Sequence, residues 1–119
     1  MEVKEEKKGN VLVFSLKGRL DSNTSPEVEK KILAAIEKNS FDIVLDFSAL
    51  DYLSSAGIRL LVHAHKQIEK HGGLILLSAV PKEIENILYI TGFLSYFKIF
   101  ETQQQALDSL AKMKNSGII

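Results

Sequence analysis

The chain has 119 residues, of which 45% are hydrophobic and 25% are charged, and it contains no cysteine. This length suits one ordinary domain and the composition is that of a globular protein, which argues against a second core and against intrinsic disorder. The 15 basic and 15 acidic residues cancel, which argues against a general nucleic-acid binder or a polybasic membrane module. Without cysteine, disulfides, thiolate catalysis and cysteine-ligated zinc are excluded.

The amino-terminal segment Met1–Lys8 is charged and alternating, and it lacks the apolar centre of a signal peptide. No apolar run approaches the ~20 residues that span a bilayer. We therefore expect a soluble, cytoplasmic single domain over residues 1–119, with a core at about 2–113 and a frayed tail at 115–119.

A β-hairpin is predicted first. Gly9 and Asn10 both tolerate positive φ, so they suit a tight turn. The turn separates an edge strand at Val3–Lys7 from a β-branched and aromatic strand at Val11–Leu16. We expect Gly18 to open a loop that continues through Arg19, Leu20, Asp21, Ser22 and Asn23.

A first helix is predicted after this loop, because Ser25 can cap a helix and Pro26 suits its first turn. Asn39 is a plausible left-handed stop. The apolar positions that recur at helical spacing are Val28, Ile32, Ala35 and Ile36.

A buried strand at Phe41–Phe47 follows the helix, which is the pattern of a βαβ unit with its right-handed crossover. A loop over Ser48–Gly57 then leads into a second helix, which Gly72 and Gly73 end. One face of that helix is apolar and another is basic. The apolar positions are Leu60, Leu61, Ala64 and Ile68, and the basic ones are Arg59, His63, Lys66 and Lys70.

The remaining elements complete a ββαβαβαβα order. A short apolar strand is predicted at Leu74–Leu77, a third helix begins at Pro81 and stops at Gly92, and a short aromatic strand covers Tyr96–Phe100. Thr102 and Gln105 have the spacing of a capping box before a last helix through Leu107, Leu110 and Met113. The fold class is α/β, a sandwich with a mixed sheet of about five strands.

Metal and nucleotide chemistry find little support. His63 and His65 are two residues apart on a helix and point about 200° apart, so they cannot grip one ion, and His71 suits the dipole at the helix end. Gly72-Gly73 follows a helix and precedes a strand, the reverse of a phosphate-binding loop. A Ser-His-Asp triad is conceivable, but the Gly-x-Ser-x-Gly elbow is missing. No catalytic residue, metal or cofactor is expected.

Two adjacent hydroxyls, Ser54 and Ser55, stand where a loop from a buried strand enters the second helix. In one interpretation, Ser54 caps the helix and Ser55 lies in its first turn. The same geometry has a chemical consequence, because free backbone N–H groups and the positive end of the helix dipole tolerate a dianionic phosphate there. Regulation by phosphorylation and plain capping are both compatible with these residues.

Three segments together resemble the STAS domain, and more narrowly the bacterial anti-sigma factor antagonists. They are Gly18–Thr24 followed by a helix, the strand Ile43–Phe47, and Leu50–Gly57, whose Ser-Ser-Ala-Gly portion is the most specific. The resemblance covers nearly the whole chain. It implies a single STAS-type domain in which the helices pack mainly on one face of the sheet.

The resemblance also implies a phosphorylation switch. In these antagonists the acceptor serine lies in a motif like Asp-Ser-Ala-Gly, and matching Ala56-Gly57 places it at Ser55, with Ser54 as the alternative. Ser54 occupies a position that is often aspartate in the family, and Arg59 one that is often glycine. The implied partner-binding residues are Asp21, Asn23, Thr24, Ser54, Ser55, Ala56, Gly57, Ile58, Arg59 and Val62.

The resemblance implies two partners: an anti-sigma factor, which is also a serine protein kinase, and a separate PP2C-type phosphatase. It also implies that the chain is a monomer or weak dimer. Ile58 and Val62 lie one turn apart, as peripheral core or as an apolar docking patch beside the serine. The alternative function is a STAS scaffold or sensor subunit without regulated phosphorylation. A small-molecule enzyme on this scaffold would need a deep pocket with converging titratable groups.

Overall fold

The computed structural model describes residues 1–39 and 42–115. Five strands form one sheet in the order β1-β2-β3-β4-β5. The pair β1·β2 is antiparallel, and the other three neighbouring pairs are parallel. The strands are β1 (Glu2–Lys8), β2 (Val11–Leu20), β3 (Asp42–Leu53), β4 (Leu74–Ser78) and β5 (Lys98–Phe100), and the helices are α1 (Ser25–Glu37), α2 (Ser55–Lys70), α3 (Lys82–Ile90), the 3₁₀ turn η1 (Leu94–Tyr96) and α4 (Gln103–Asn115).

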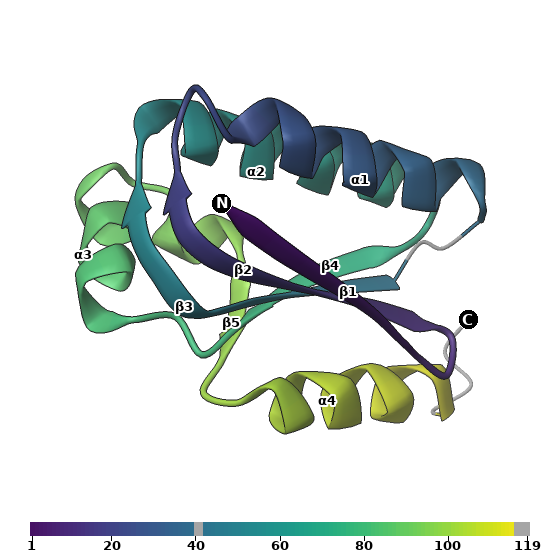
Figure 1. The fold of residues 1–119 in the computed structure, drawn as a ribbon. Coiled ribbons are helices and arrows are strands. Elements are labelled where there is room, and N and C mark those ends of the chain that lie inside the picture. The colour runs from purple at the N-terminus through teal and green to yellow at the C-terminus, as the bar shows by residue number, and fades with distance from the viewer. Residues whose placement is uncertain (40–41, 116–119) are drawn as a thin grey trace.

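The helices cover the two faces of the sheet unequally, as Figure 1 shows, with α1 and α2 above the sheet and α4 below it. Side chains alternate along each strand, so Phe14 and Leu45 enter the large cluster beneath α1, α2 and α3. Their neighbours Val13 and Val44 enter a smaller cluster with Leu110 of α4. The predicted α/β architecture is confirmed, with α4 on the second face of the sheet.

Two predicted loops are wrong in part, because residues 18–20 and 48–53 are strand, whereas residues 21–23 lie in a loop as predicted. β2 continues through Gly18 to Leu20, and β3 continues beyond Phe47 to Leu53. The two extensions pair with each other in parallel, with irregularities in register on either side of Lys17 and Gly18. Gly18 has φ 110°, a conformation open to glycine, so the chain can bend there and remain in the sheet.

Other boundaries differ by a few residues. Ser25 is the first residue of α1 and Thr24 occupies the N-cap, so the expected cap at Ser25 is wrong. The aromatic strand is shorter than predicted, since Tyr96 belongs to η1 and β5 begins at Lys98. Phe41 and residues 116–119 lie outside the described part of the chain, and α4 extends to Asn115.

Several predicted helix signals are confirmed. Asn39 has φ 62° after α1, and Gly92 has φ 83° after α3. Thr102 Oγ1 accepts a hydrogen bond of 3.1 Å from the N–H of Gln105, and Gln105 Oε1 accepts one of 3.1 Å from the N–H of Glu101. Within residues 1–39 and 42–115, no helix has the length and apolar character needed to cross a membrane.

Candidate functional site

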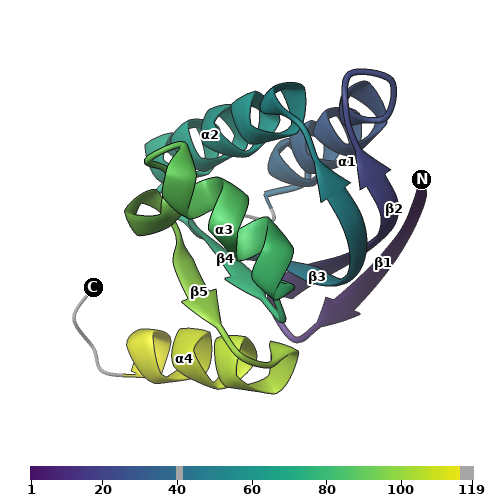
Figure 2. The ribbon, with the colours of Figure 1, turned by 90° about the vertical axis from the view of Figure 1, so that its left-hand side faces the viewer.

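The candidate site lies where β2 and β3 end. Leu20 and Leu53 are partners in the parallel register, so the two strands finish side by side at the same edge of the sheet. The N–H of Ser54 donates a 3.0 Å hydrogen bond to the Leu20 carbonyl oxygen. Figures 1 and 2 both show the β2–α1 loop beside the start of α2. Chain segments at the carboxyl ends of parallel strands are a common place for binding.

Asp21 organises the β2–α1 loop. Its Oδ1 accepts hydrogen bonds of 2.9 Å from the N–H of Asn23 and 3.2 Å from the N–H of Thr24. The Thr24 hydroxyl accepts from the N–H of Asp21 at 2.9 Å and donates to the Arg19 carbonyl oxygen at 2.7 Å. The N–H of Asn23 contributes most to lowering the pKa of the Asp21 carboxyl, with help from Thr24 and Arg19 and against the opposing effect of burial. Asp21 and Thr24 therefore shape the loop, while Asn23 is exposed.

Arg19 adds a contact that the sequence did not point to. Its guanidinium carbon lies 4.1 Å from the centre of the Tyr52 ring, and its Nε lies 3.6 Å from Asp21 Oδ2. The strand pairing brings Arg19 opposite Tyr52. Both residues lay in segments predicted as loops, so no signal in the sequence placed them together.

The two serines at the start of α2 have different surroundings. Ser54 is the N-cap residue, and its half-buried hydroxyl accepts a hydrogen bond of 3.2 Å from the N–H of Gly57. Ser55 is the first residue of the helix and is exposed. The predicted capping by Ser54 is confirmed, and the Ser55 hydroxyl is the one left accessible at the positive end of the helix.

Gly57 allows α2 to approach the end of β2 closely. A Cβ atom at this position would lie 2.7 Å from Leu53 Cδ1 and 2.8 Å from the Leu20 carbonyl oxygen. These distances are shorter than van der Waals contact, so no side chain fits without movement. Gly57 is buried, and its lack of a side chain allows the position that the serines take beside the end of β2.

Ile58 and Val62, the pair predicted as peripheral core or as a docking patch, differ in burial. The side chain of Ile58 is 5% exposed and belongs to the main core cluster, whereas Val62 is half-buried and packs against that cluster. The burial of Ile58 favours the interpretation of this pair as peripheral core, and contact of either residue with a partner stays a prediction. Arg59 is exposed and Ala56 is half-buried, so both remain reachable from outside.

A groove between α1 and α2 is lined by Ala56, the residue that follows the exposed serine. His63 Nδ1 lies 2.8 Å from Glu29 Oε2, and this pair joins the two helices across the groove. The sequence gives no signal for such a contact, because the two residues are 34 positions apart on different helices. The groove is lined by Ser22, Ser25, Pro26, Glu29, Ala56, Arg59, Leu60 and His63.

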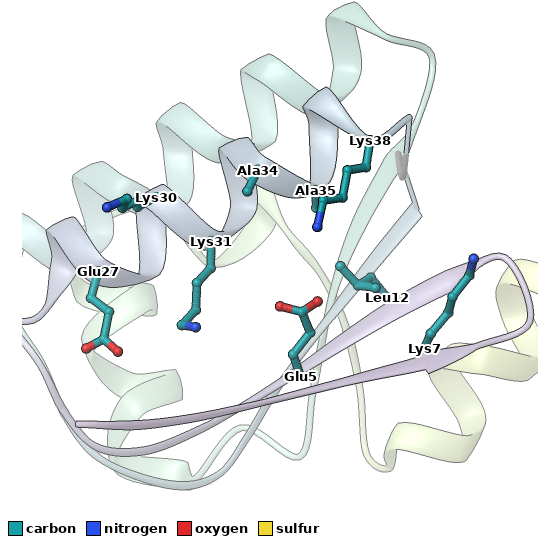
Figure 3. Close-up of a pocket in the computed structure, with 9 residues that line it drawn as sticks. All are labelled: Glu5, Lys7, Leu12, Glu27, Lys30, Lys31, Ala34, Ala35 and Lys38. Atoms are coloured by element: carbon teal, nitrogen blue, oxygen red, sulfur yellow. The ribbon is translucent and has the colours of Figure 1, made fainter.

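A second groove lies apart from the serines, between β1 and α1 (Figure 3). It contains Glu5 and Glu27 together with several lysines above an apolar floor that includes Leu12. Figure 3 shows Lys30 and Lys7 at opposite ends of this groove, so its charges are spread out rather than converging on one point.

The histidines are engaged separately. His65 stacks edge-on against Tyr96, with ring centres 4.8 Å apart, and His71 Nδ1 lies 2.9 Å from the Gln67 carbonyl oxygen at the end of α2. In the part of the chain that the structure describes, no three histidine, aspartate or glutamate side chains group so as to hold a metal ion.

Known proteins with similar sequences match this chain over most of its length. The chain is 29% identical over 106 residues to BtrV of Bordetella bronchiseptica, which bears the name anti-sigma factor antagonist, covering 89% of this chain and 91% of the relative. It is 26% identical over 111 residues to the anti-sigma F factor antagonist of Paenibacillus polymyxa, covering 92% and 95% respectively.

The fold is also that of solved structures. The anti-sigma factor antagonist SpoIIAA in its unphosphorylated form superposes with a TM-score of 0.83, at 20% identity, covering 93% of this chain and 97% of SpoIIAA. The phosphorylated form of Bacillus SpoIIAA superposes with a TM-score of 0.74 at 22% identity, covering 92% of this chain and 99% of that one. The family model for the STAS domain matches residues 2–106. This match takes in the sheet, the β2–α1 loop and the serines of α2, and the chain belongs to the STAS domain family.

Proposed function

We propose that this chain is an anti-sigma factor antagonist whose unphosphorylated form binds an anti-sigma factor and frees the sigma factor, and that phosphorylation of Ser55 ends the binding. The names of its relatives from Bordetella and Paenibacillus support the first part. The observation that carries the second is the division of roles between Ser54, whose hydroxyl caps α2, and Ser55, whose side chain is exposed one residue later.

Phosphorylation of Ser55 is compatible with the fold. The anti-sigma factor, acting as a serine kinase, transfers the γ-phosphoryl group of ATP to Ser55 Oγ, with release of ADP and of the hydroxyl proton. The phosphate then lies at the amino-terminal end of α2, where the N–H groups of the first turn have no acceptors within the helix. Negative charge is favourable there, so the helix is retained.

The same phosphate opposes docking. It brings nearly two negative charges to a surface that would lose its water in the complex. A loss of about 3–4 kcal/mol in binding free energy corresponds to two to three decades in affinity. In this scheme the protein is a ligand and a kinase substrate rather than a catalyst, it works in the cytoplasm as a monomer or weak dimer, and a PP2C-type phosphatase resets it.

The partner surface follows from the geometry of the site. The exposed or half-buried members of the predicted set are the ones that can contact the anti-sigma factor directly. Asp21 and Thr24 act by holding the β2–α1 loop in shape, and Gly57 acts by setting the position of α2. The direct contacts proposed are Asn23, Ser54, Ser55, Ala56, Arg59 and Val62.

The test is phosphorylation by an anti-sigma factor kinase from the same organism, followed by intact-mass measurement. The expected result is the gain of one phosphate, which Ser55→Ala abolishes and Ser54→Ala preserves. Ser48→Ala is the matched control, since Ser48 is exposed on β3. If Ser54→Ala abolishes the gain of phosphate and Ser55→Ala does not, the phosphorylated residue is Ser54 and the proposal for Ser55 is wrong.

Binding is measured in the same experiment by titrating unphosphorylated and phosphorylated protein against the immobilised kinase with a non-hydrolysable ATP analogue. We expect at least a hundredfold weaker binding after phosphorylation. If no anti-sigma kinase of that organism modifies or binds the chain, the proposal fails and the scaffold or sensor function takes its place.

A further inference from the structure

We propose that Arg59 binds the phosphate of phosphorylated Ser55 from one helical turn away, and so withdraws itself from the partner surface when the switch is set. This inference rests on the proposed function only in taking Ser55 as the phosphorylated residue. The inference adds that a residue of the same chain, Arg59, binds the phosphate directly.

The spacing of the two residues carries the first step. Ser55 and Arg59 both lie on α2 and both are exposed. Residues four apart on an α-helix lie about 40° apart around the axis, with Cβ atoms about 5–6 Å from each other. A phosphate on the earlier residue and a guanidinium on the later one also have the more favourable order for a charged pair. The planar guanidinium can donate two parallel hydrogen bonds to phosphate oxygens.

The charges around Arg59 carry the second step. Glu29 is the carboxylate that lines the groove beside Arg59, and it is paired with His63 at 2.8 Å. Asp21 is held by the N–H groups of its own loop, and its neighbour Arg19 stacks on Tyr52. Among the described residues, no carboxylate oxygen lies within the 4.0 Å of an ion pair to Arg59. Its charge is thus available for a phosphate.

The groove contains a further polar group that points to a ligand. Ser25 lines the same groove as Arg59 and is 8% exposed, and its Oγ has no hydrogen-bond partner within the described part of the chain. A buried hydroxyl without a partner is costly unless something else supplies the bond. A phosphate drawn toward Arg59 would bring acceptor oxygens, and the water bound to them, to the mouth of this groove.

The consequence is a reversal of charge at the binding surface. Without phosphate, the pair of positions 55 and 59 presents one positive charge; with a dianionic phosphate it presents about one negative charge. The chemistry of a partner that recognises the unphosphorylated form is therefore an acidic side chain facing Arg59. Phosphorylation both adds repulsion and removes this contact, which makes a single modification more effective than charge alone.

The test uses phosphoserine placed at position 55 by genetic encoding, so that it does not depend on any kinase. The second ionisation of the phosphate is followed by ³¹P NMR during a pH titration. We expect the phosphate pKa to lie about half a unit to one unit lower in the protein with Arg59 than in its Arg59→Ala variant. Arg59→Lys should fall between them, because it keeps the charge and loses the two-bond geometry.

Lys66→Ala is the matched control. Lys66 is exposed on the same helix, about 16 Å along the helix axis from position 55. This distance exceeds the Debye length of about 8–10 Å at physiological ionic strength, so salt screens the charge of Lys66 from the phosphate. Lys66→Ala should leave the phosphate pKa unchanged. Equal pKa values in the parent and in Arg59→Ala would overturn the proposal, even if kinases do phosphorylate Ser55. A shifted pKa in a chain that no kinase modifies would instead uphold the Arg59 contact and defeat the proposed function.

Discussion

The N–H of Ser54 donates a hydrogen bond of 3.0 Å to the carbonyl oxygen of Leu20, at the point where β2 ends and α2 begins. This bond joins two segments that are far apart in the sequence. Because Ser55 follows directly, the position of its hydroxyl is set by the edge of the sheet as well as by its own helix. The Leu20 carbonyl oxygen also lies against Gly57, so the N-cap residue and two residues of α2 depend on the end of β2.

Replacing Gly57 with alanine should destabilise the protein. A Cβ atom would lie 2.8 Å from the Leu20 carbonyl oxygen, and overpacking of this kind costs about 1–3 kcal/mol. The upper end of this range applies, because the Leu20 oxygen belongs to the backbone and cannot turn aside. Alanine regains about 1 kcal/mol through its helix propensity, so we expect a net loss of about 2 kcal/mol in the free energy of unfolding. Urea denaturation measures it, with Ser55→Ala as the neighbouring exposed control. A Gly57→Ala variant as stable as the parent would contradict the close approach.

Removing the Ser54 hydroxyl should cost about 1 kcal/mol, because the N–H of Gly57 loses its capping acceptor. Ser54→Asp supplies another acceptor with a favourable charge and should recover most of the loss. Ser55→Ala should change the free energy of unfolding by less than about 0.5 kcal/mol, since its side chain is exposed. If Ser54→Ala and Ser55→Ala lower the free energy of unfolding equally, Ser54 is not the residue that caps α2 alone, and the proposed difference between the two hydroxyls is wrong.

The Asp21 carboxyl should titrate below its ordinary value of 3.8, chiefly because the N–H of Asn23 donates to it. A lowered pKa in the folded state means that this carboxylate stabilises the fold at pH values above 3.8. That contribution is lost as the pH falls through the folded pKa. Carbon-detected NMR titration of the side-chain carboxyl gives the pKa directly.

Two variants bear on this titration. Thr24→Val removes the hydroxyl that lies 3.3 Å from Asp21 Oδ1, so it should move the pKa back toward 3.8. Asp21→Asn should remove this residue's share of the acid-induced loss of stability. A pKa at or above 3.8 in the parent protein would refute the hydrogen-bonded loop.

Shortening Leu110 to alanine should cost about 2–4 kcal/mol, because its side chain is 1% exposed within the cluster that joins α4 to the sheet. This cluster has few members, so amide exchange along α4 should quicken more than along α2. Lys112→Ala, on the exposed side of the same helix, is the control. Unchanged exchange in α4 would show that Leu110 does not anchor it.

Local patterns were sufficient wherever one segment of chain carries its own signal. The hairpin turn at Gly9, the stop at Asn39 and the cap at Ser54 all depend on residues within a few positions of one another. The resemblance to the STAS domain drew on such short segments, and the family match confirms it.

Predictions from local patterns failed where the structure of one segment depends on contacts with a segment distant in the sequence. Residues 18–20 and 48–53 were predicted as parts of loops, yet they are strands because each segment supplies hydrogen bonds to the other. Ile58 stands on the flank of α2 between an apolar and a basic face, so helix periodicity left it between core and surface. Only the packing of α2 against the sheet buries it.

The sequence by itself determined the order of elements, the family, and the pair of serines at the start of α2. The tertiary structure decided which hydroxyl is exposed at the site, how Glu29 is occupied by His63, and that Arg59 is left with its charge available. The physical reason is the range of the forces involved. Propensity and capping act over one or two turns, whereas pairing, burial and ion contacts depend on residues that meet only after the chain has folded.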